Sequence, residues 1–434
     1  MSACLDTLTR MSAQNSVPAF VPVVVGGDIG AYSLARAFHE AYGIRSVVIS
    51  RLEGWHISRS ALIENVRCTD PFDPAQLAPV LQSVAAARPG VRLMLLGSAD
   101  ATVKAIIRVR DEMDVLDERW VVPYVDLATF RAATEKQNFT ELCERLGVDH
   151  PRTRIVDLSA EVSDDLDVPF AYPVIAKPAE VSEWKKAQFP GKQKVHTVGS
   201  REELLALLRT IREAGYRESI IVQDRIPGDD QNMRILTCYC DAASRVRFAS
   251  WGRTLLEEHT PGAIGNPAAI ITGVNEEMVA QAQKLCKELG WVGYANFDLK
   301  YDPRDGRTKF FELNPRLGRS NYYVTAGGHN PVRWYVDEHL GGGLPAVPAG
   351  GAPEIVQHQE ETLYTVVPVA LVKKYTTLPE AKEQLRRVLK SGRVRNPLFY
   401  RGVEKDPKRL GYSVAAMVNY VRKFRRHYHP EAQA

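Results

Sequence analysis

The positions of the candidate functional side chains are decided by the stretch Asn296-Phe297-Asp298-Leu299-Lys300 and, after a short turn, by Phe310-Phe311-Glu312-Leu313-Asn314-Pro315-Arg316. Residues 292–301 and 307–313 are rich in aromatic and β-branched side chains, and the segment between them contains proline and glycine. This pattern predicts a β-hairpin. Because side chains alternate along a strand, Glu312 and Asn314 share one face.

The length of the turn decides whether Asp298 joins that face. A loop from Pro303 to Arg307 places Asp298 directly across from Glu312, whereas a two-residue Asp305-Gly306 loop puts the two acids on opposite faces. Directly opposed residues have Cβ atoms about 5 Å apart. Two carboxylates and the Asn314 amide oxygen at that range form the hard oxygen set that Mg²⁺ prefers, with nucleotide phosphates completing its shell.

The alternative is a surface hairpin whose acids are solvated and balanced by Lys300, Arg307 and Lys309. The apolar residues Leu299 and Phe310 favour a mostly buried hairpin. Since buried carboxylates need partners, the metal site is the preferred interpretation.

Length and composition are those of an ordinary globular protein with several subdomains: the chain has 434 residues and a net charge of +4. It has no run of 18 apolar residues and no secretory h-region at its N-terminus. None of its six cysteines forms a CxxC pair, so we expect reduced thiols and a cytoplasmic location.

The N-terminal part predicts a parallel α/β domain over residues 18–125. Apolar strand patterns at residues 20–25, 46–50 and 91–96 alternate with helical patterns. The turn Gly26-Gly27-Asp28-Ile29-Gly30 lacks GxGxxG spacing, so a substrate-facing loop or tight packing is favoured over nucleotide binding.

Several cations lie upstream of the hairpin. Lys136 falls inside a helical pattern over residues 126–147, and Lys177 ends an apolar strand. Each is either a surface lysine or aimed at a phosphate, whose charge must be neutralised during transfer. The segment 181–198, with Lys192 and Lys194 beside Gly191, is either a solvated loop or a lid that excludes water.

Taken in order, these motifs resemble the ATP-grasp superfamily of carboxylate–amine ligases over residues 127–340. The resemblance implies a mixed α/β architecture: the parallel α/β domain precedes a two-lobed ATP-grasp fold at 126–345, with its small lobe at about 152–225. It implies ATP and Mg²⁺ as cofactors. The nucleotide contacts it implies are Lys136, Lys177, Lys192, Lys194, Gln223, Asp224, Ile226 and Asp230. The magnesium ligands it implies are Asp298, Glu312 and Asn314, and the catalytic residues are Lys177 and Arg316.

One departure from the family pattern is Asn296, which stands where many relatives carry an arginine. Arg253 or Arg234, on neighbouring predicted strands, could supply that charge.

The segment 312–323, with Gly327-Gly328-His329-Asn330 beyond it, is similar to the D-aspartate ligases of peptidoglycan crossbridge synthesis. The similarity implies an enzyme that activates D-aspartate or a similar amino acid as an acyl phosphate. It then joins this group to an amine of a peptidoglycan stem peptide, on an acceptor such as a UDP-linked muropeptide. Arg316, Arg319 and Ser320 would lie near the substrate, since arginine forks bind carboxylates. The alternative is a ligase that makes a free dipeptide or another small amide.

Residues 354–434 form a basic C-terminal extension after a linker at 345–353. Between residues 372 and 427 there are 16 Lys/Arg and 4 Asp/Glu. This charge is either a solvated face or a contact with an anionic membrane surface or precursor. The second interpretation predicts a peripheral location at the inner face of the membrane. We expect no nucleic-acid partner.

Overall fold

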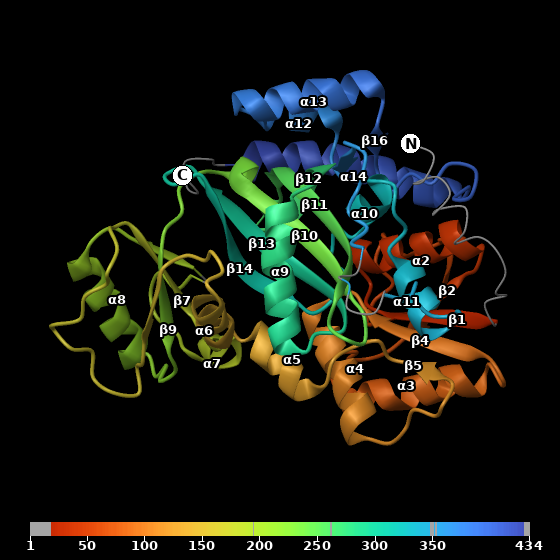
Figure 1. Ribbon diagram of the computed structural model, residues 1–434, viewed down its shortest axis with the longest axis horizontal. Coiled ribbons are helices and arrows are strands. Elements are labelled where there is room, and N and C mark those ends of the chain that lie inside the picture. The colour runs from red at the N-terminus through yellow and green to blue at the C-terminus, as the bar shows by residue number, and fades with distance from the viewer. Residues whose placement is uncertain (1–18, 194, 261–262, 348–350, 352–353, 429–434) are drawn as a thin grey trace.

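The computed structural model describes residues 19–428, with gaps at 194, 261–262, 348–350 and 352–353. Three sheets organise the chain (Figure 1). A five-stranded sheet belongs to the N-terminal domain, a four-stranded sheet forms a small lobe set apart from the body, and a seven-stranded sheet lies between them.

The N-terminal sheet has the order β3-β2-β1-β4-β5 and all its pairs are parallel, as predicted. Its strands are β1 (Phe20–Val25), β2 (Ser46–Ser50), β3 (Ile63–Arg67), β4 (Arg92–Gly97) and β5 (Trp120–Val121). Its helices are α2 (Ile29–Tyr42), α3 (Pro74–Ala86) and α4 (Asp100–Glu112). Asp28 caps α2 by accepting a 3.1 Å hydrogen bond from the Ala31 amide.

Two helices lead into the small lobe, where the sequence predicted one. Helix α5 (Leu127–Thr134) stops at Glu135, whose backbone is extended (φ −72°, ψ 120°), and α6 (Lys136–Leu146) starts directly after it. The break places Lys136 at the first position of α6.

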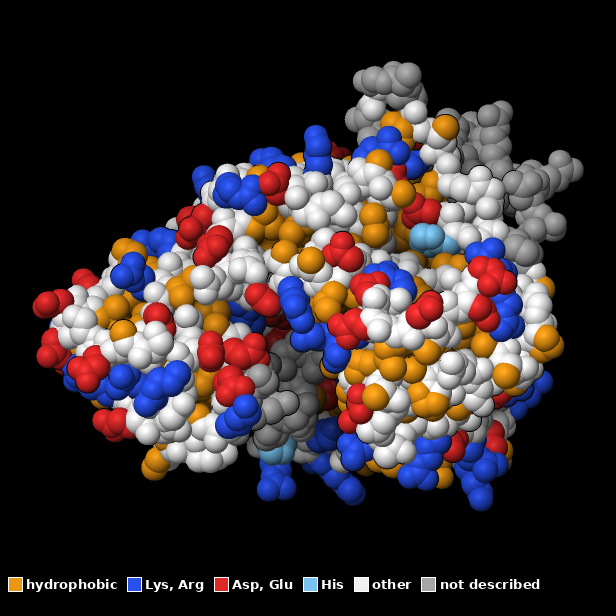
Figure 2. Space-filling view, turned by 90° about the horizontal axis from the view of Figure 1, so that it is seen from below, with side chains coloured by type: hydrophobic (Ala, Val, Ile, Leu, Met, Phe, Trp, Pro, Cys, Tyr) orange, Lys and Arg blue, Asp and Glu red, His pale blue; other side chains and the backbone are white. Residues whose placement is uncertain are grey.

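The small lobe is an antiparallel sheet in the order β6-β9-β7-β8 with its own core, which includes Trp184 and Val222. Its elements are β6 (Thr153–Val156), β7 (Val174–Pro178), α7 (Val181–Lys186), β8 (His196–Val198), α8 (Arg201–Glu213) and β9 (Ile220–Asp224). In Figure 2 it forms a separate mass at the left, with acidic and basic side chains spread over both parts of the surface.

The large sheet has the order β14-β13-β10-β11-β12-β15-β16. Its strands are β10 (Met233–Cys240), β11 (Val246–Glu257), β12 (Pro267–Gly273), β13 (Gly293–Asp302), β14 (Arg307–Asn314), β15 (Leu363–Thr365) and β16 (Val394–Arg395). The remaining helices are η1 (Asp230–Asn232), α9 (Glu276–Leu289), α10 (Tyr322–Ala326), α11 (Val332–His339), α12 (Val369–Tyr375), α13 (Pro379–Ser391) and α14 (Pro407–His427). Because β15 and β16 come from the basic extension, that extension is part of the large sheet.

The β13–β14 hairpin pairs Asp298 with Glu312, as predicted, but not through the predicted loop. Asp302 pairs with Arg307, so the turn ends at Gly306, and the loop predicted to run to Arg307 is wrong. That turn alone would oppose Asp298 to Phe311. The register shifts by one residue beside Asp298, which leaves Phe311 as a β-bulge and returns Glu312 to the face of Asp298.

No helix among the described residues is long and apolar enough to cross a membrane. The cysteines within the described ranges are free and buried.

Candidate active site

The predicted metal ligands come together on the hairpin. Asn314 Nδ2 donates to Asp298 Oδ2 at 3.1 Å, and Glu312 opposes Asp298 across the ladder. Burial, and then the facing Glu312 carboxylate, raise the pKa of Asp298 to about 8. A buried carboxyl with a raised pKa, a facing carboxylate and an amide are a donor set that fits a hard divalent cation.

The protein alone supplies only part of a cation's shell at this site. Within the described ranges, no cluster of three or more His, Cys, Asp or Glu side chains could hold a metal ion. A cation held by Asp298, Glu312 and Asn314 therefore needs further oxygen ligands, which phosphate groups can provide.

Arg316 lies beside this acid pair and connects it to the N-terminal domain. Its Nη2 donates to Asn314 Oδ1 at 3.4 Å, and its Nε lies 2.9 Å from Asp100 Oδ1 at the start of α4. Burial raises the pKa of Asp100, Arg316 lowers it, and Glu312 raises it further. The guanidinium thus sits among carboxylates where the two domains meet.

Lys177 reaches the same hairpin from the small lobe. Its Nζ lies 6.0 Å from the centre of the Phe311 ring, which belongs to the bulge residue. Lys136, at the start of α6, is half-buried, and the structure places it on the connection into the small lobe.

The predicted lid contacts its own lobe in this structure. Lys192 Nζ donates to the Ala187 carbonyl at 2.5 Å and lies 5.7 Å from the centre of the Trp184 ring. Gly191 has a φ of +74°, a conformation that suits glycine. Lys194 lies outside the described residues.

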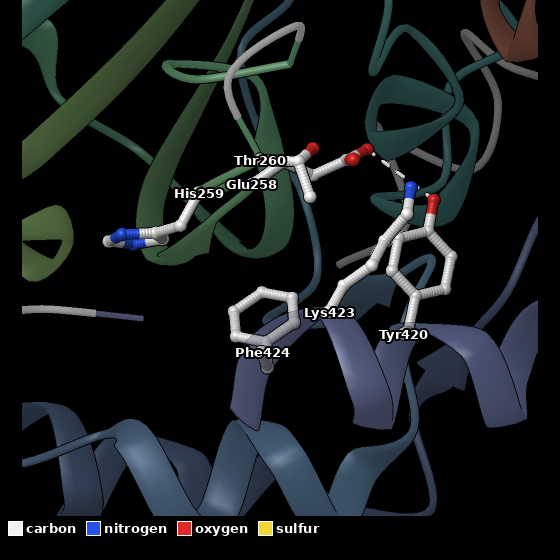
Figure 3. Close-up of a pocket in the computed structure, with 6 residues that line it drawn as sticks. All are labelled: Glu258, His259, Thr260, Tyr420, Lys423 and Phe424. Carbon is white, nitrogen blue, oxygen red and sulfur yellow. Dashed lines mark hydrogen bonds between the residues drawn. The ribbon is translucent and has the colours of Figure 1, made fainter. Parts of the chain in front are cut away.

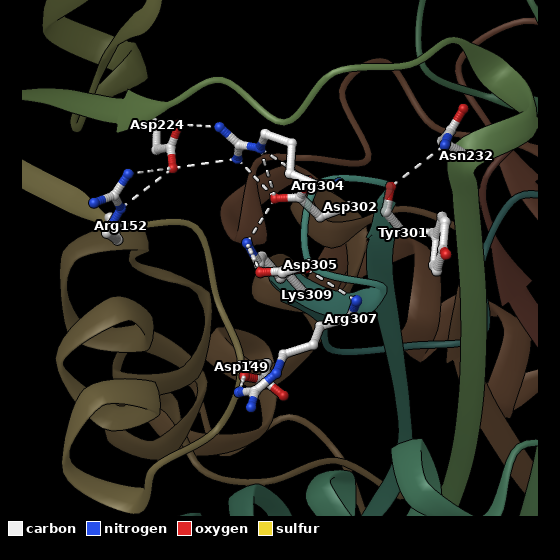
Figure 4. Close-up of polar contacts among 10 residues, drawn as sticks. All are labelled: Asp149, Arg152, Asp224, Asn232, Tyr301, Asp302, Arg304, Asp305, Arg307 and Lys309. Atoms are coloured by element: carbon white, nitrogen blue, oxygen red, sulfur yellow. Dashed lines mark hydrogen bonds and ion pairs between the residues drawn. The ribbon is translucent and has the colours of Figure 1, made fainter. Parts of the chain in front are cut away.

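The predicted hinge links the small lobe to the hairpin turn (Figure 4). The buried Asp224 carboxylate pairs with Arg304 at 2.9 Å and with Arg152 at 3.1 Å. Gln223 is buried and donates to Thr153 Oγ1 at 3.0 Å, and Ile226 is also buried. The side chain of Asp224 is therefore engaged in holding the lobes together. Because β9 also pairs with β6 and β7 on its two sides, a base would meet the backbone beyond Asp224.

Asp230 is buried beyond the hinge, and only one of its two carboxylate oxygens has a hydrogen-bond partner among the described residues. Its Oδ2 accepts from the Glu257 amide at 2.8 Å and lies 2.9 Å from His259 Nε2. Its Oδ1 is buried without a hydrogen-bond partner. An orphaned carboxylate oxygen is an acceptor ready for a hydroxyl group, which fits the predicted ribose contact.

Sequence reasoning missed three residues that surround this site. Burial, with Asp230 and Asp298 adding to it, raises the pKa of Glu257 well above its usual range. Lys300 Nζ donates to the Gly228 carbonyl at 2.9 Å, and burial lowers the pKa of its ammonium. With His259, they surround Asp230; the run Glu257-Glu258-His259 at the end of a buried strand was the available signal.

The predicted substrate residues lie where the large sheet meets the N-terminal domain. Arg319 Nη1 pairs with the buried Glu258 at 2.9 Å, and Ser320 is buried at the entrance to α10. A Cβ on Gly30 would lie 3.3 Å from the Arg319 Cα, and Asn321 donates to the Gly30 carbonyl. The first glycine-rich turn therefore packs tightly on the segment of Arg319 and Asn321, which agrees with the tight-packing interpretation; whether it faces a substrate stays a prediction.

The compensation proposed for Asn296 is wrong. Arg234 and Arg253 oppose each other on β10 and β11, and Arg234 is the neighbour of Ile235, the residue opposite Asp298. Neighbours on a strand point to opposite faces, so both arginines face away from the acid pair. Asn296 instead accepts a hydrogen bond from Thr237 at 2.7 Å.

Comparison with known proteins places this arrangement in a class. The family described as "Carbamoyl-phosphate synthase L chain, ATP binding domain" matches residues 259–326. The L-amino acid ligase of Bacillus licheniformis superposes with a TM-score of 0.52 at 15% identity, covering 75% of each chain. The MgADP complex of the biotin carboxylase domain of Hydrogenobacter thermophilus 2-oxoglutarate carboxylase gives 0.54 at 16%, covering 77% of this chain and 73% of that one.

The fold is thus the ATP-grasp fold, and the protein is an ATP-binding carboxylate–amine ligase of that superfamily. Among curated proteins, the D-aspartate ligase of Enterococcus faecium (strain Aus0004) is 33% identical over 419 residues, which is 94% of this chain and 97% of that protein. The chain belongs to the D-aspartate ligase family.

Proposed function

We propose that this enzyme uses ATP to activate a carboxylate of D-aspartate, or of a similar small amino acid, and joins it to an amine on a peptidoglycan stem peptide. The observation that carries this proposal is the 33% identity to a D-aspartate ligase along nearly the whole of both chains. The intact set of acids, amide and cations described above supports turnover rather than mere nucleotide binding.

The reaction has two steps. A carboxylate oxygen of the amino acid attacks the γ-phosphorus, which forms an acyl phosphate and releases ADP. The acceptor amine then attacks the acyl carbon, phosphate leaves with the bonding electrons, and the amine loses a proton. Both steps concentrate negative charge on phosphate oxygens, so catalysis is mainly positioning and electrostatic stabilisation.

The chain supplies cations from three directions. Lys177 approaches the hairpin from the small lobe and Arg316 from the domain boundary, where each would contact phosphate oxygens. Lys136 and Lys192, with Lys194, would complete the phosphate contacts once the lid closes. Mg²⁺ bound by Asp298, Glu312 and Asn314 would neutralise phosphate charge.

The nucleoside would sit at the hinge. The backbone just beyond the sheet-paired residues Gln223 and Asp224, with the Ile226 side chain, would take the adenine, and Asp230 Oδ1 would accept from a ribose hydroxyl.

A coupled ADP-release assay tests the proposal. The purified enzyme is given ATP, Mg²⁺ and D-aspartate, L-aspartate or D-alanine, each with and without a UDP-linked muropeptide that has a free side-chain amine. We expect ADP release and a muropeptide heavier by one aspartyl residue, seen by mass spectrometry, with D-aspartate. Turnover without the muropeptide, yielding a free dipeptide, would instead favour the alternative ligase, and no ADP release with any amino acid would contradict both.

The location remains a prediction. We expect the enzyme in the cytoplasm, where ATP and muropeptide precursors are available, with the basic extension contacting the anionic inner face of the membrane. Co-sedimentation with phosphatidylglycerol vesicles at low and high salt would test this contact.

A further inference from the structure

Helix α14, near the end of the chain, covers the segment that follows β11 (Figure 3). The Tyr420 hydroxyl lies 3.4 Å from Glu258 Oε1, and the buried Phe424 ring lies 6.1 Å from the His259 ring. Lys423 lines the same small pocket between α14 and residues 258–260. Part of the basic extension thus reaches the residues that hold Arg319 and Asp230.

Three cations converge here, but their charges are not equally compensated. Arg319 pairs with Glu258 at 2.9 Å, and Arg409 pairs with Glu404 at 3.1 Å. Within the described part of the chain, Lys423 forms no ion pair with a carboxylate. Its ammonium lies 5.4 Å from the Tyr420 ring centre, and the residue as a whole is half-buried.

The imidazole of His56 lies near all three of these cations and is neutral. Burial, and then Arg319, Arg409 and Lys423, lower the pKa of His56 to about 3. The His56 Nε2 atom is buried and has no hydrogen-bond partner. Excess positive charge beside an unpartnered buried nitrogen is what a site for an anion provides.

This pocket lies beside a residue that shares a face of the large sheet with the acid pair. Directly opposed residues share a face. Four such pairs place Tyr364 of β15 on the same face as Asp298: Asp298–Ile235, Ile235–Gly252, Thr254–Ile270 and Ile270–Tyr364. Gly252 and Thr254 share that face because they are two residues apart on β11. Burial raises the pKa of Tyr364, Arg319 lowers it, and Tyr420 and Glu258 raise it further, so the residues that form the pocket lie near the Tyr364 hydroxyl. Asp28, the other nearby acid, is engaged as the cap of α2.

We propose that α14 completes the amino-acid site and that Lys423 binds the second carboxylate of an acidic substrate, the one that is not activated. This inference rests on the proposed function. An acidic amino acid brings two carboxylates: one must meet the γ-phosphate near Arg316, and the other needs an uncompensated cation. Arg319 is already neutralised by Glu258, so it orients the pocket, whereas Lys423 supplies the free charge.

The test compares D-aspartate with D-asparagine, which lacks the second charge. In the wild type, kcat/KM should favour D-aspartate. Lys423→Met should reduce that preference by about 10- to 100-fold, the range expected for one lost charge-assisted hydrogen bond. The loss should appear in the KM for D-aspartate while the KM for ATP stays near its wild-type value.

Two variants serve as controls. Arg422→Met removes the adjacent, exposed charge of α14 and should leave the preference unchanged. Lys423→Arg keeps the charge and should retain most of the preference for D-aspartate over D-asparagine. Thermal unfolding confirms that each variant is folded.

The outcomes separate the two proposals. Wild-type turnover of D-aspartate with an unchanged preference in Lys423→Met, or an equal loss for both substrates, would overturn the role of Lys423 alone. Absence of D-aspartate turnover by the wild type would contradict the proposed function and this inference with it.

Discussion

At the scale of single residues, the hairpin holds a pair of carboxylates whose repulsion is built into the strand register. Asp298 and Glu312 face each other, and burial, followed by the Glu312 charge, raises the pKa of Asp298 to about 8. A residue pair that is unfavourable by itself and favourable with a cation is typical of a metal-binding site rather than a structural one.

Asp298→Asn should therefore separate activity from stability. We expect ADP release to fall by about 100-fold or more, the scale of losing one preorganised electrostatic contact. In EDTA the variant should melt no lower than the wild type, because one of the facing charges is gone. Asp305→Asn, in the same hairpin but outside the acid pair, is the matched control. Near-normal ADP release by Asp298→Asn would contradict the assignment.

His56 makes a prediction about pH. Its folded pKa of about 3 lies below the ordinary value of about 6.5, so the unfolded chain binds the proton more readily. Stability is therefore lost as pH falls from about 6.5 toward 3. Between pH 7 and pH 5 the loss from this residue is at most about 2 kcal/mol. Urea unfolding of His56→Gln should show a correspondingly weaker acid dependence, and an identical dependence would argue against it.

At the scale of elements, the β-bulge at Phe311 shows what a sequence pattern can miss. Alternation predicted the shared face of Glu312 and Asn314, and that part is confirmed. The loop prediction is wrong because a bulge adds one residue to one strand, and local sequence does not show where the ladder shifts. The bulge residue Phe311 also contacts Lys177, and this contact links the small lobe to the hairpin that carries the acid pair.

The hinge depends on Arg304, which joins Asp224 of β9 to the buried Asp302 of the hairpin turn. Although burial opposes it, hydrogen bonds from Arg304 and Lys309 hold the pKa of Asp302 well below its usual range. Arg304→Met should cost about 1–2 kcal/mol, since Lys309 still pairs with Asp302 and the Arg304 side chain is itself partly exposed.

Hydrogen exchange should detect this change as faster exchange in the small lobe, with a higher KM for ATP. Arg307→Met removes a more exposed ion pair from the same turn and provides the comparison. Equal exchange in the two variants would mean that Arg304 does not hold the lobes together.

At the scale of the whole molecule, the basic extension packs against the N-terminal domain. Glu404 accepts from the Ser60 hydroxyl at 2.5 Å and from the Ala61 amide at 3.0 Å, and its ion pair with Arg409 is buried. The Arg409 guanidinium also lies 4.4 Å from the Tyr32 ring centre and donates to the Ser58 carbonyl. The N-terminal domain and the extension are thus packed as one unit.

Arg409→Met should destabilise the protein by about 3 kcal/mol, because it leaves the Glu404 carboxylate buried without its cation. Urea unfolding measures the loss. Lys408→Met, an exposed neighbour on α14, should change stability by less than about 0.5 kcal/mol. A similar result for the two variants would mean that this ion pair does not anchor the extension.

The sequence by itself determined the parallel N-terminal sheet, the hairpin and the family, because these depend on local periodicity and on ordered motifs. The tertiary structure decided the break before Lys136, the bulge at Phe311 and the place of α14. The sequence showed α14 as a cationic helix that was either solvated or bound to a surface. Only long-range packing revealed that one face of it is buried over Glu258 and the other exposed, since net charge does not specify which side of a helix meets the core.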